Sequence, residues 1–330
     1  MVFRRGSLKD KNYIVGQVLR IQLPLNKIIF HIFVFKRIKR IDMSIIPESE
    51  LIINSDGSVF HLHIKPEQLA DKIIMMGDPD RVTLTASFFD SIECEVQSRE
   101  FHTITGTYKG KRITALSHGI GPDNIDIVIT ELDALANVDF KTREVKKDFK
   151  QLIMVRVGTS GGLQPHCPIG SYVVSEKSIG FDGVLNYYEG RNSVAELDFE
   201  EAFKKHVNWS PLHCAPYVVK ADEGLVQQIG HDMIKGVTIS AIGFYGPQGR
   251  TVRIPLANPD LNSRIESFKF GSDVITNYEM ESAPLAGLGR LMGHKAMTVC
   301  TIIANRLAGE SNSNYKGSIE DLIKTVLDRI

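Results

Sequence analysis

Short apolar runs alternate with amphipathic stretches along the chain from Lys72 onward. The apolar runs are continuous, which is typical of strands that are buried on both faces of a sheet. The stretches between them repeat apolar residues at the spacing of helices that cover such a sheet. Strands are predicted over residues 72–76, 112–117, 151–157, 171–176, 237–243, 272–280 and 295–303. Helices are predicted over residues 125–138, 222–233, 258–268, 280–291 and 317–329.

This alternation of strands and helices predicts an α/β fold around a largely parallel or mixed sheet. The sequence contains no internal repeat and no low-complexity segment. We interpret the charged residues 141–150 and the polar region 186–210 as surface insertions and not as linkers between domains. Residues 43–330 are therefore expected to form a single domain.

The first 42 residues differ from the rest in charge, because Lys and Arg recur there against only Asp10 and Asp42. Their apolar run, IIFHIFVF, is far shorter than the ~20 residues that a membrane span needs. It also lacks the cleavage site of a signal peptide. We interpret residues 1–42 as an atypical, non-native extension with Met43 as the true start. A basic membrane-surface or targeting segment is the alternative.

The formal net charge of the 330-residue chain is zero, which gives no support for a nucleic-acid partner or a membrane surface. The four cysteines lie far apart and form no C-x-x-C, so a zinc site or a disulfide framework is not expected. This cysteine usage fits a reducing compartment, here the cytoplasm. The sequence also lacks H-E-x-x-H, and no resident metal or cofactor is expected.

Five small residues, GTSGG at 158–162, follow the predicted strand 151–157. They fit G-x-S-x-G, the nucleophile elbow of serine hydrolases, but that elbow requires a helix directly after Ser160. The residues that follow, LQPHCPIG, contain two prolines and then enter the next predicted strand. We therefore predict a glycine-rich turn whose N–H groups and Thr159 hydroxyl face an anion.

Polar and glycine residues gather after the predicted strands, where α/β folds bind their ligands. Arg81 follows one strand, and Arg156 lies within another, just before the glycines. A buried arginine needs a partner, because an unpaired charge is costly in a protein interior. A bound phosphate would provide one; a carboxylate that only holds the sheet together is the alternative. The other strand-end residues are Gly77, Asp78, His118, Gly119, Thr159, Ser160, 244–250 and 279–281.

Six motifs in this order, GDPDR, SREF, SHGIG, VRVGTSGGLQP, FYGPQGR and NYEMESA, resemble those of nucleoside phosphorylases of the uridine phosphorylase type. The resemblance runs from about Phe60 to the C-terminus. It implies a three-layer α/β/α fold with a central mixed, barrel-like sheet. It also implies cleavage of a nucleoside by inorganic phosphate to a free base and ribose 1-phosphate. Active sites in this family lie at the interface of a homodimer, which is often built into a hexamer.

Carried over residue by residue, the resemblance implies a phosphate site, a ribose site and a base site. Phosphate would be held by Gly77, Arg81, Arg156, Thr159 and, from the neighbouring subunit, Arg99. Ribose would be held by Glu281, Met280 and the neighbour's copy of His61. The base would meet Ser160, Gly161, Phe244, Gln248, Arg250 and Ile303, with Glu279 and Arg306 behind them. Catalysis would fall to Arg250, Gln248, Glu281 and Arg156.

The base site favours a pyrimidine. Arg250 and Gln248 can bond the carbonyl oxygens and N3–H of uracil and stabilise its developing negative charge. The purine phosphorylases that the chain resembles carry an aspartate where TIIANR places Asn305, which cannot transfer a proton. Uridine is the expected substrate, with deoxyuridine and thymidine next. A purine or broad-specificity phosphorylase, a hydrolytic nucleosidase and a silent nucleoside-binding protein remain as alternatives.

Two departures from the family pattern bear on these expectations. Gly246-Pro247 reverses the usual order before the glutamine, and Gly249 replaces a bulkier residue, so the loop over the base is expected to differ. The family associates the position of Glu100 with a monovalent cation between subunits. Asp123 and Asn124 replace the Pro-Ser of enteric members in that region, which weakens the case for a potassium ion.

Overall fold

The computed structural model describes residues 14–20, 31–37, 45–305 and 309–330. The chain divides into two compact units, residues 1–46 and 47–330. In the first unit, β1 (Ile14–Arg20) and β2 (His31–Arg37) pair antiparallel, which the sequence pattern did not predict. No helix in the described part of the chain is long and apolar enough to cross a membrane.

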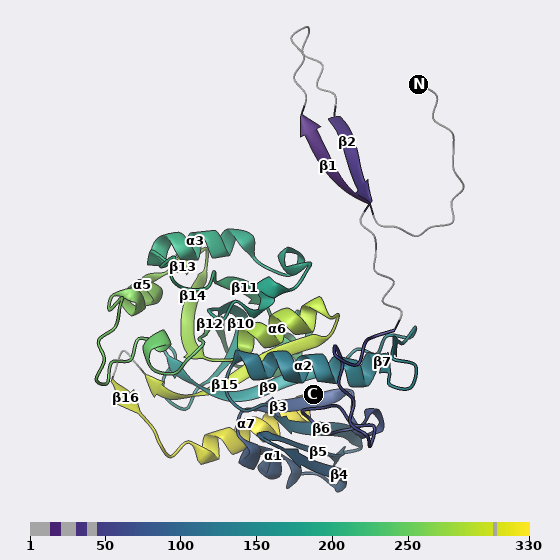
Figure 1. Ribbon diagram of the computed structural model, residues 1–330. Helices are drawn as coiled ribbons and strands as arrows, with labels where there is room; N and C mark the ends of the chain where they lie inside the picture. Colours follow the sequence, from purple (N-terminus) through teal and green to yellow (C-terminus); the bar gives the residue numbers. More distant parts are fainter. Residues whose placement is uncertain (1–13, 21–30, 38–44, 306–308) are drawn as a thin grey trace, which may run out of the picture. The chain divides into compact units, whose positions relative to one another are not determined.

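The second unit is built around one mixed sheet (Figure 1), with strands in the order β13-β14-β12-β10-β15-β9-β3-β6-β5-β4. β11 pairs with β10, and β16 pairs with β15. A further pairing of β14 with β9 closes β9, β15, β10, β12 and β14 into a small barrel. The strands are β3 (Lys72–Met76), β4 (Ser91–Ser98), β5 (Phe101–Tyr108), β6 (Lys111–Ser117), β9 (Ile153–Gly162), β10 (Tyr172–Gly180), β11 (Tyr217–Lys220), β12 (Ile234–Ser240), β13 (Lys269–Phe270), β14 (Asp273–Glu279), β15 (Lys295–Asn305) and β16 (Glu310–Ser311).

Helices cover both faces of the sheet, because alternate residues of its central strands point to opposite sides. Ile73 and Met75 of β3 pack in one core with α2 and α6, while Ile74 and Met76 pack in another with α1, α4 and α7. Figure 1 shows α2 and α6 on one side of the strands and α1 and α7 on the other. The helices are α1 (Pro79–Ala86), α2 (Pro122–Asn137), α3 (Leu197–Val207), α4 (Glu223–Gly230), α5 (Leu261–Ser267), α6 (Ser282–Leu291) and α7 (Lys316–Arg329). This three-layer α/β/α arrangement confirms the predicted fold class.

The predicted strands and helices are all present, but the region 186–210 was interpreted wrongly. It contains α3, whose Phe199, Phe203 and Val207 are buried in a third core with α5 and β12. These residues are four positions apart, so they share one helix face. Residues 141–150 are mostly exposed, as expected, and hold β8 (Glu144–Val145), which pairs with β7 (Val138–Asp139).

The glycine-rich segment was also predicted wrongly, because it is a strand and not a turn. β9 runs through to Gly162, with Thr159 opposite Thr301 of β15 and Gly162 opposite Asn277 of β14. The absent side chains allow close packing there. A Cβ atom on Gly162 would lie 2.7 Å from the carbonyl oxygen of Cys167. The strand therefore continues where its neighbours come closest, at the junction that closes the barrel.

Candidate active site

A cavity of about 760 Å³ opens at the carboxyl ends of β3, β9 and β14. This volume suits a small molecule such as a nucleoside with an anion. The lining includes all the residues that the sequence assigned to this chain's own phosphate, ribose and base sites: Gly77, Arg81, Arg156, Thr159, Ser160, Gly161, Phe244, Gln248, Arg250, Met280, Glu281 and Ile303. Most of the other strand-end residues predicted to converge line it as well, but His118 and residues 245–247 and 249 do not.

One end of the cavity is suited to an anion. β3 ends at Met76, and Asp78 caps α1 by accepting the N–H of Asp80 at 3.0 Å. The positive end of α1 therefore faces this part of the cavity. The Arg81 guanidinium lies 5.8 Å from the ring centre of Tyr315, and its Nη2 lies 3.5 Å from the Tyr315 hydroxyl. A Cβ atom at Gly77 would come within 3.0 Å of a backbone oxygen, so the bare backbone is required here.

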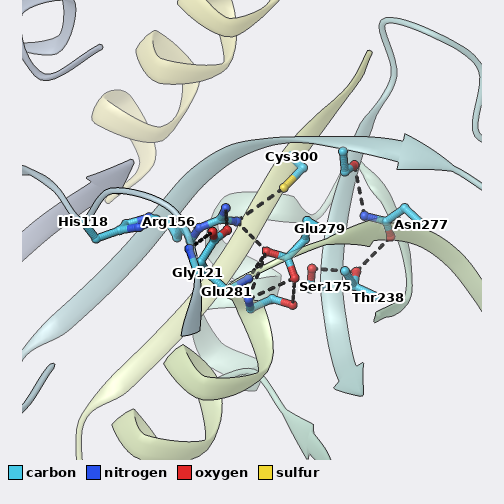
Figure 2. A network of polar contacts seen from close by, with 11 residues as sticks. His118, Gly121, Arg156, Ser175, Thr238, Asn277, Glu279, Glu281 and Cys300 are labelled. Atoms are coloured by element: carbon cyan, nitrogen blue, oxygen red, sulfur yellow. Dashed lines mark hydrogen bonds and ion pairs between the residues drawn. The ribbon is translucent and has the colours of Figure 1, made fainter. Parts of the chain in front are cut away.

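Arg156 lies deeper, only 5% exposed, and is held from both sides of its strand (Figure 2). Its Nη1 lies 2.9 Å from Glu279 Oε2, its Nη2 bonds Glu281 Oε2, and its Nε donates to His118 Nε2 at 3.2 Å. Burial alone would lower the pKa of Arg156, but the two carboxylates outweigh that effect and raise it. The carboxylate partner that was the alternative to phosphate is therefore present.

The two glutamates of the NYEMESA motif have different surroundings. The Glu279 carboxylate accepts the Glu281 N–H at 2.8 Å and the Ser282 N–H at 3.0 Å, so it caps α6. Glu281 Oε1 accepts the N–H of Gly121 at 2.8 Å. Burial raises the pKa of Glu281, an effect that Arg156 opposes. Glu281 thus lines the cavity in a position fixed by Arg156 and Gly121.

The cavity is also lined by the loop that contains Phe244, Gln248 and Arg250. The Arg250 guanidinium lies 3.9 Å from the ring centre of Phe244, and its Nη1 lies 2.5 Å from Gln248 Oε1. Gly249 has a φ of +69°, and a Cβ atom there would lie 2.2 Å from the Asn262 side chain. A bulkier residue at position 249 is therefore incompatible with this loop, which accounts for that departure from the family pattern.

Ser160 is fixed by a buried polar chain that the sequence analysis missed. Asn277 Nδ2 donates to the Ser160 hydroxyl at 3.1 Å, and Asn277 Oδ1 accepts from Thr238 at 2.9 Å. The hydroxyl oxygens of Thr238 and Ser175 lie 2.7 Å apart (Figure 2). The only signal for this polar chain in the sequence is the polar pair Thr276-Asn277 between Ile275 and Tyr278 of β14. The lining residues Ser311, Asn312, Ser313 and Tyr315 were not predicted either.

Asn305 stands apart from the lining. Asn305 is 8% exposed, and its Nδ2 lies 3.4 Å from the carbonyl oxygen of Cys167. The cavity is lined instead by Ile303 and Ala304 of the same strand. Arg306 lies outside the described residues.

The two residues expected from a neighbouring subunit, His61 and Arg99, are absent from the cavity lining, but they lie near one another. His61 Nδ1 is 2.6 Å from Glu131 Oε1, and the other ring nitrogen, Nε2, takes no part in this contact. The His61 ring packs against Phe60 at 4.8 Å between ring centres, and the Arg99 guanidinium lies 5.7 Å from the same ring. Within one chain, these two side chains form a separate polar cluster around Phe60.

The described residues contain no group of three or more His, Cys, Asp or Glu side chains that could hold a metal ion. A potassium ion near Glu100 stays untested. A second cavity, of about 830 Å³, lies on the other side of the loop and is lined mainly by apolar residues, including Trp209, Leu212 and Ile254. Arg250 lines both cavities. Of these two cavities, only the smaller one combines arginines with carboxylates and a helix N-terminus.

Comparisons with known proteins agree with this geometry. Residues 71–328 match the sequence profile of the phosphorylase superfamily. The chain is 30% identical over 261 residues to uridine phosphorylase of Thermococcus kodakarensis, covering 77% of this chain and 80% of that protein. It is 26% identical over 274 residues to a DeoD-type purine nucleoside phosphorylase of Colwellia psychrerythraea, covering 82% of this chain and 98% of the other.

A solved structure also resembles the chain closely. It is a Trypanosoma brucei nucleoside phosphorylase, described as showing uridine phosphorylase activity. It matches with a TM-score of 0.76 and 27% identity, covering 84% of this chain and 98% of the other. Relatives named for pyrimidine and for purine nucleosides thus share this fold and most of this length.

Proposed function

The chain belongs to the phosphorylase superfamily, and from this premise we propose that it cleaves uridine with inorganic phosphate to uracil and ribose 1-phosphate. The observation that carries the proposal is that one cavity is lined by both groups that the reaction needs. Arg81, Arg156 and the start of α1 suit a phosphate, and Gln248 and Arg250 suit a base. Glu281, which lines the same cavity, would hold the ribose.

The residues that line the cavity match the charges that develop during phosphorolysis. Breaking the N-glycosidic bond leaves positive charge on the ribose and negative charge on the departing base. A phosphate held by Arg81, Arg156 and Thr159 would lie against the ribose and form the new bond at C1′, while Glu281 and Met280 hold the sugar. Guanidinium groups suit this role because their planar N–H pairs match phosphate oxygens.

At the base site, Arg250 and Gln248 would bind the uracil ring. Their donors can bond the uracil oxygens as the ring becomes an anion, and such a preorganised donor is worth roughly 3–4 kcal/mol. Phe244, Ser160, Gly161 and Ile303 would complete this site. A pyrimidine leaving as a delocalised anion needs no protein acid, and Asn305, which cannot transfer a proton, does not line the cavity.

A purine or broad-specificity phosphorylase is the competing proposal, because DeoD-type relatives match at similar identity. The test compares kcat/KM for uridine, deoxyuridine, thymidine and inosine at saturating phosphate. We expect uridine to be preferred over inosine by about 100-fold or more, and the Asn305→Asp variant to keep that order. A preference for inosine in the unchanged protein would overturn the proposal.

Membership of the phosphorylase superfamily is also the basis for proposals about assembly and location. We propose a homodimer as the smallest active unit, in which each chain lends His61 and Arg99 to the other's cavity. Residues 43–330 would form the phosphorylase domain, with residues 1–42 dispensable for the reaction. We propose a cytoplasmic enzyme of pyrimidine salvage that needs no cofactor besides its co-substrate phosphate.

A further inference from the structure

His118 is a buried, titratable group to which the reaction as proposed above assigns no role. It follows directly after β6, and its backbone N–H donates to the carbonyl oxygen of Met76 at 2.9 Å, next to the phosphate end of the cavity. Its side chain has no exposed surface and does not line the cavity. His118 therefore cannot touch a substrate, and any role must pass through a neighbouring side chain.

That neighbour is Arg156, and the contact defines the protonation of the ring. An arginine side chain offers only donors, so His118 Nε2 must accept the Arg156 Nε–H, which lies 3.2 Å away. The neutral ring then carries its proton on Nδ1, which has no hydrogen-bond partner among the described residues. Burial, and next the charge of Arg156, hold the pKa of His118 well below its usual value, so the ring stays a neutral acceptor.

The donors of Arg156 can then be accounted for one by one. Of its five N–H groups, Nε uses its single hydrogen on His118. Nη1 faces Glu279 Oε2 at 2.9 Å and the Cys300 sulfur at 3.8 Å, and Nη2 places one hydrogen on Glu281. One hydrogen of Nη2 remains for a ligand. The guanidinium can therefore offer a phosphate that hydrogen without giving up a protein partner.

The partners of Arg156 lie on two sides of its strand. Glu279 and Glu281 come from the end of β14, whereas His118 comes from the end of β6, beyond β3 in the sheet (Figure 2). The carboxylates pull the terminal nitrogens in one direction, and only His118 engages Nε from the other. Without this acceptor, the guanidinium would be free to turn toward the two glutamates.

We propose that His118 is a positioning residue that holds the Arg156 guanidinium in the orientation that presents its remaining N–H to phosphate. The proposal rests on the function proposed above, because it concerns the same phosphate site. It assigns to His118 an effect on phosphate binding and not on the chemistry of the base.

Three substitutions separate this role from mere packing. In His118→Gln, the side-chain oxygen reaches about as far as Nε2 and can accept the Arg156 N–H. In His118→Asn, the oxygen lies nearer the position of Nδ1, and in His118→Leu no acceptor remains. Another buried histidine, His294, is bonded to Asp133 at 3.0 Å and does not line the cavity, so His294→Gln is the matched control.

Calorimetric titration of the full chain with inorganic phosphate, without nucleoside, is the primary measurement. We expect the Asn and Leu variants to bind phosphate about tenfold more weakly or worse, and the Gln variant to stay within about threefold of the unchanged protein. The control should bind phosphate normally. Thermal unfolding of the Gln and Asn variants should be similar, so that the difference between them reports on acceptor position.

Equal phosphate affinity in the Gln, Asn and Leu variants would overturn the proposal, and so would equal losses in Gln and Asn. Absence of phosphate binding by the unchanged protein would overturn it as well. Steady-state assays with uridine then distinguish a failure of the proposed function from a failure of the role proposed for His118. If uridine is not cleaved but phosphate binding follows the predicted order, the proposed function fails while the role of His118 stands.

Discussion

The two arginines of the candidate phosphate site have different amounts of freedom. Arg156 is buried and held by Glu279, Glu281 and His118, whereas the Arg81 side chain is 14% exposed and lies 3.8 Å from the half-exposed carboxylate of Asp78. Pairing of this kind near the surface is weak. Arg81 can therefore turn its planar fork to a ligand at little cost, while Arg156 contributes charge from a fixed position.

Substitution of Arg81 should therefore act on phosphate and little on stability. Arg81→Lys keeps the charge but loses the fork, and we expect the phosphate KM to rise about tenfold. Arg81→Ala should raise it by about 100-fold or more. Arg112→Ala is the control, because that surface arginine bonds Glu93 at 2.8 Å and does not line the cavity. An unchanged phosphate KM in Arg81→Ala would remove Arg81 from the site.

Buried His118 should also make stability depend on pH. Its pKa is lowered in the folded protein, so below about pH 6.5 the unfolded chain takes up a proton that the folded chain does not. The contribution of His118 to stability is therefore fully present above its unfolded pKa. It is lost as the pH falls toward the folded pKa, by at most about 1.4 kcal/mol per pH unit.

Urea unfolding of the unchanged protein and of His118→Gln between about pH 7.5 and 5.5 tests this dependence. The variant should lose less stability over that range, because the other titrating groups are common to both proteins. Glu281 is among them, and its raised pKa acts in the opposite direction, with stability lost as the pH rises. Parallel curves for the two proteins would mean that His118 titrates normally.

At the scale of the element, β9 combines the sheet junction with the candidate site. A Cβ atom on Gly158 would lie 2.8 Å from Arg156 Nη1 and 3.0 Å from the Cys300 sulfur. The guanidinium therefore lies along its own strand only because position 158 has no side chain. Glycines also interrupt the apolar run at this point, which is why the sequence pattern did not predict that the strand continues beyond residue 157.

Gly158→Ala should thus displace the Arg156 guanidinium and raise the phosphate KM by about tenfold or more. The control is Gly317→Ala in the first turn of α7, where a new Cβ atom meets nothing within 4 Å. Alanine favours a helix by roughly 0.5–1 kcal/mol over glycine, so the control should be slightly more stable and equally active. Equal phosphate KM values for both variants would show that Gly158 has no bearing on Arg156.

Local pattern was sufficient where a strand is continuously apolar and failed where polar or small side chains interrupt it. The central strands β3, β9 and β15 have long apolar runs and were predicted. The exposed edge strand β4 was missed, and so was β5, which is buried but carries Thr at alternate positions. The cavity residues next to strand ends were predicted because parallel strands end at one edge. Tyr315 and Asn277 were not, because only tertiary contacts bring them beside Arg81 and Ser160.

For the whole molecule, the cluster of His61 and Arg99 around Phe60 makes a dimer testable through activity. If each cavity uses Arg81 of its own chain and Arg99 of its neighbour, Arg81→Ala and Arg99→Ala should each be nearly inactive alone. A mixed dimer would contain one intact site. Equal mixing during refolding or coexpression should therefore recover about a quarter of the normal activity. A mixture as inactive as its components would contradict a shared site.

The central claim is that the cavity binds a nucleoside and phosphate together and transfers the ribose between them. The most direct test incubates the purified chain with uridine, with and without inorganic phosphate, and follows uracil, ribose 1-phosphate and free ribose. We predict uracil and ribose 1-phosphate in equal amounts, formed only when phosphate is present. Uracil and free ribose formed without phosphate would contradict the account, because a hydrolase has no need of the two arginines.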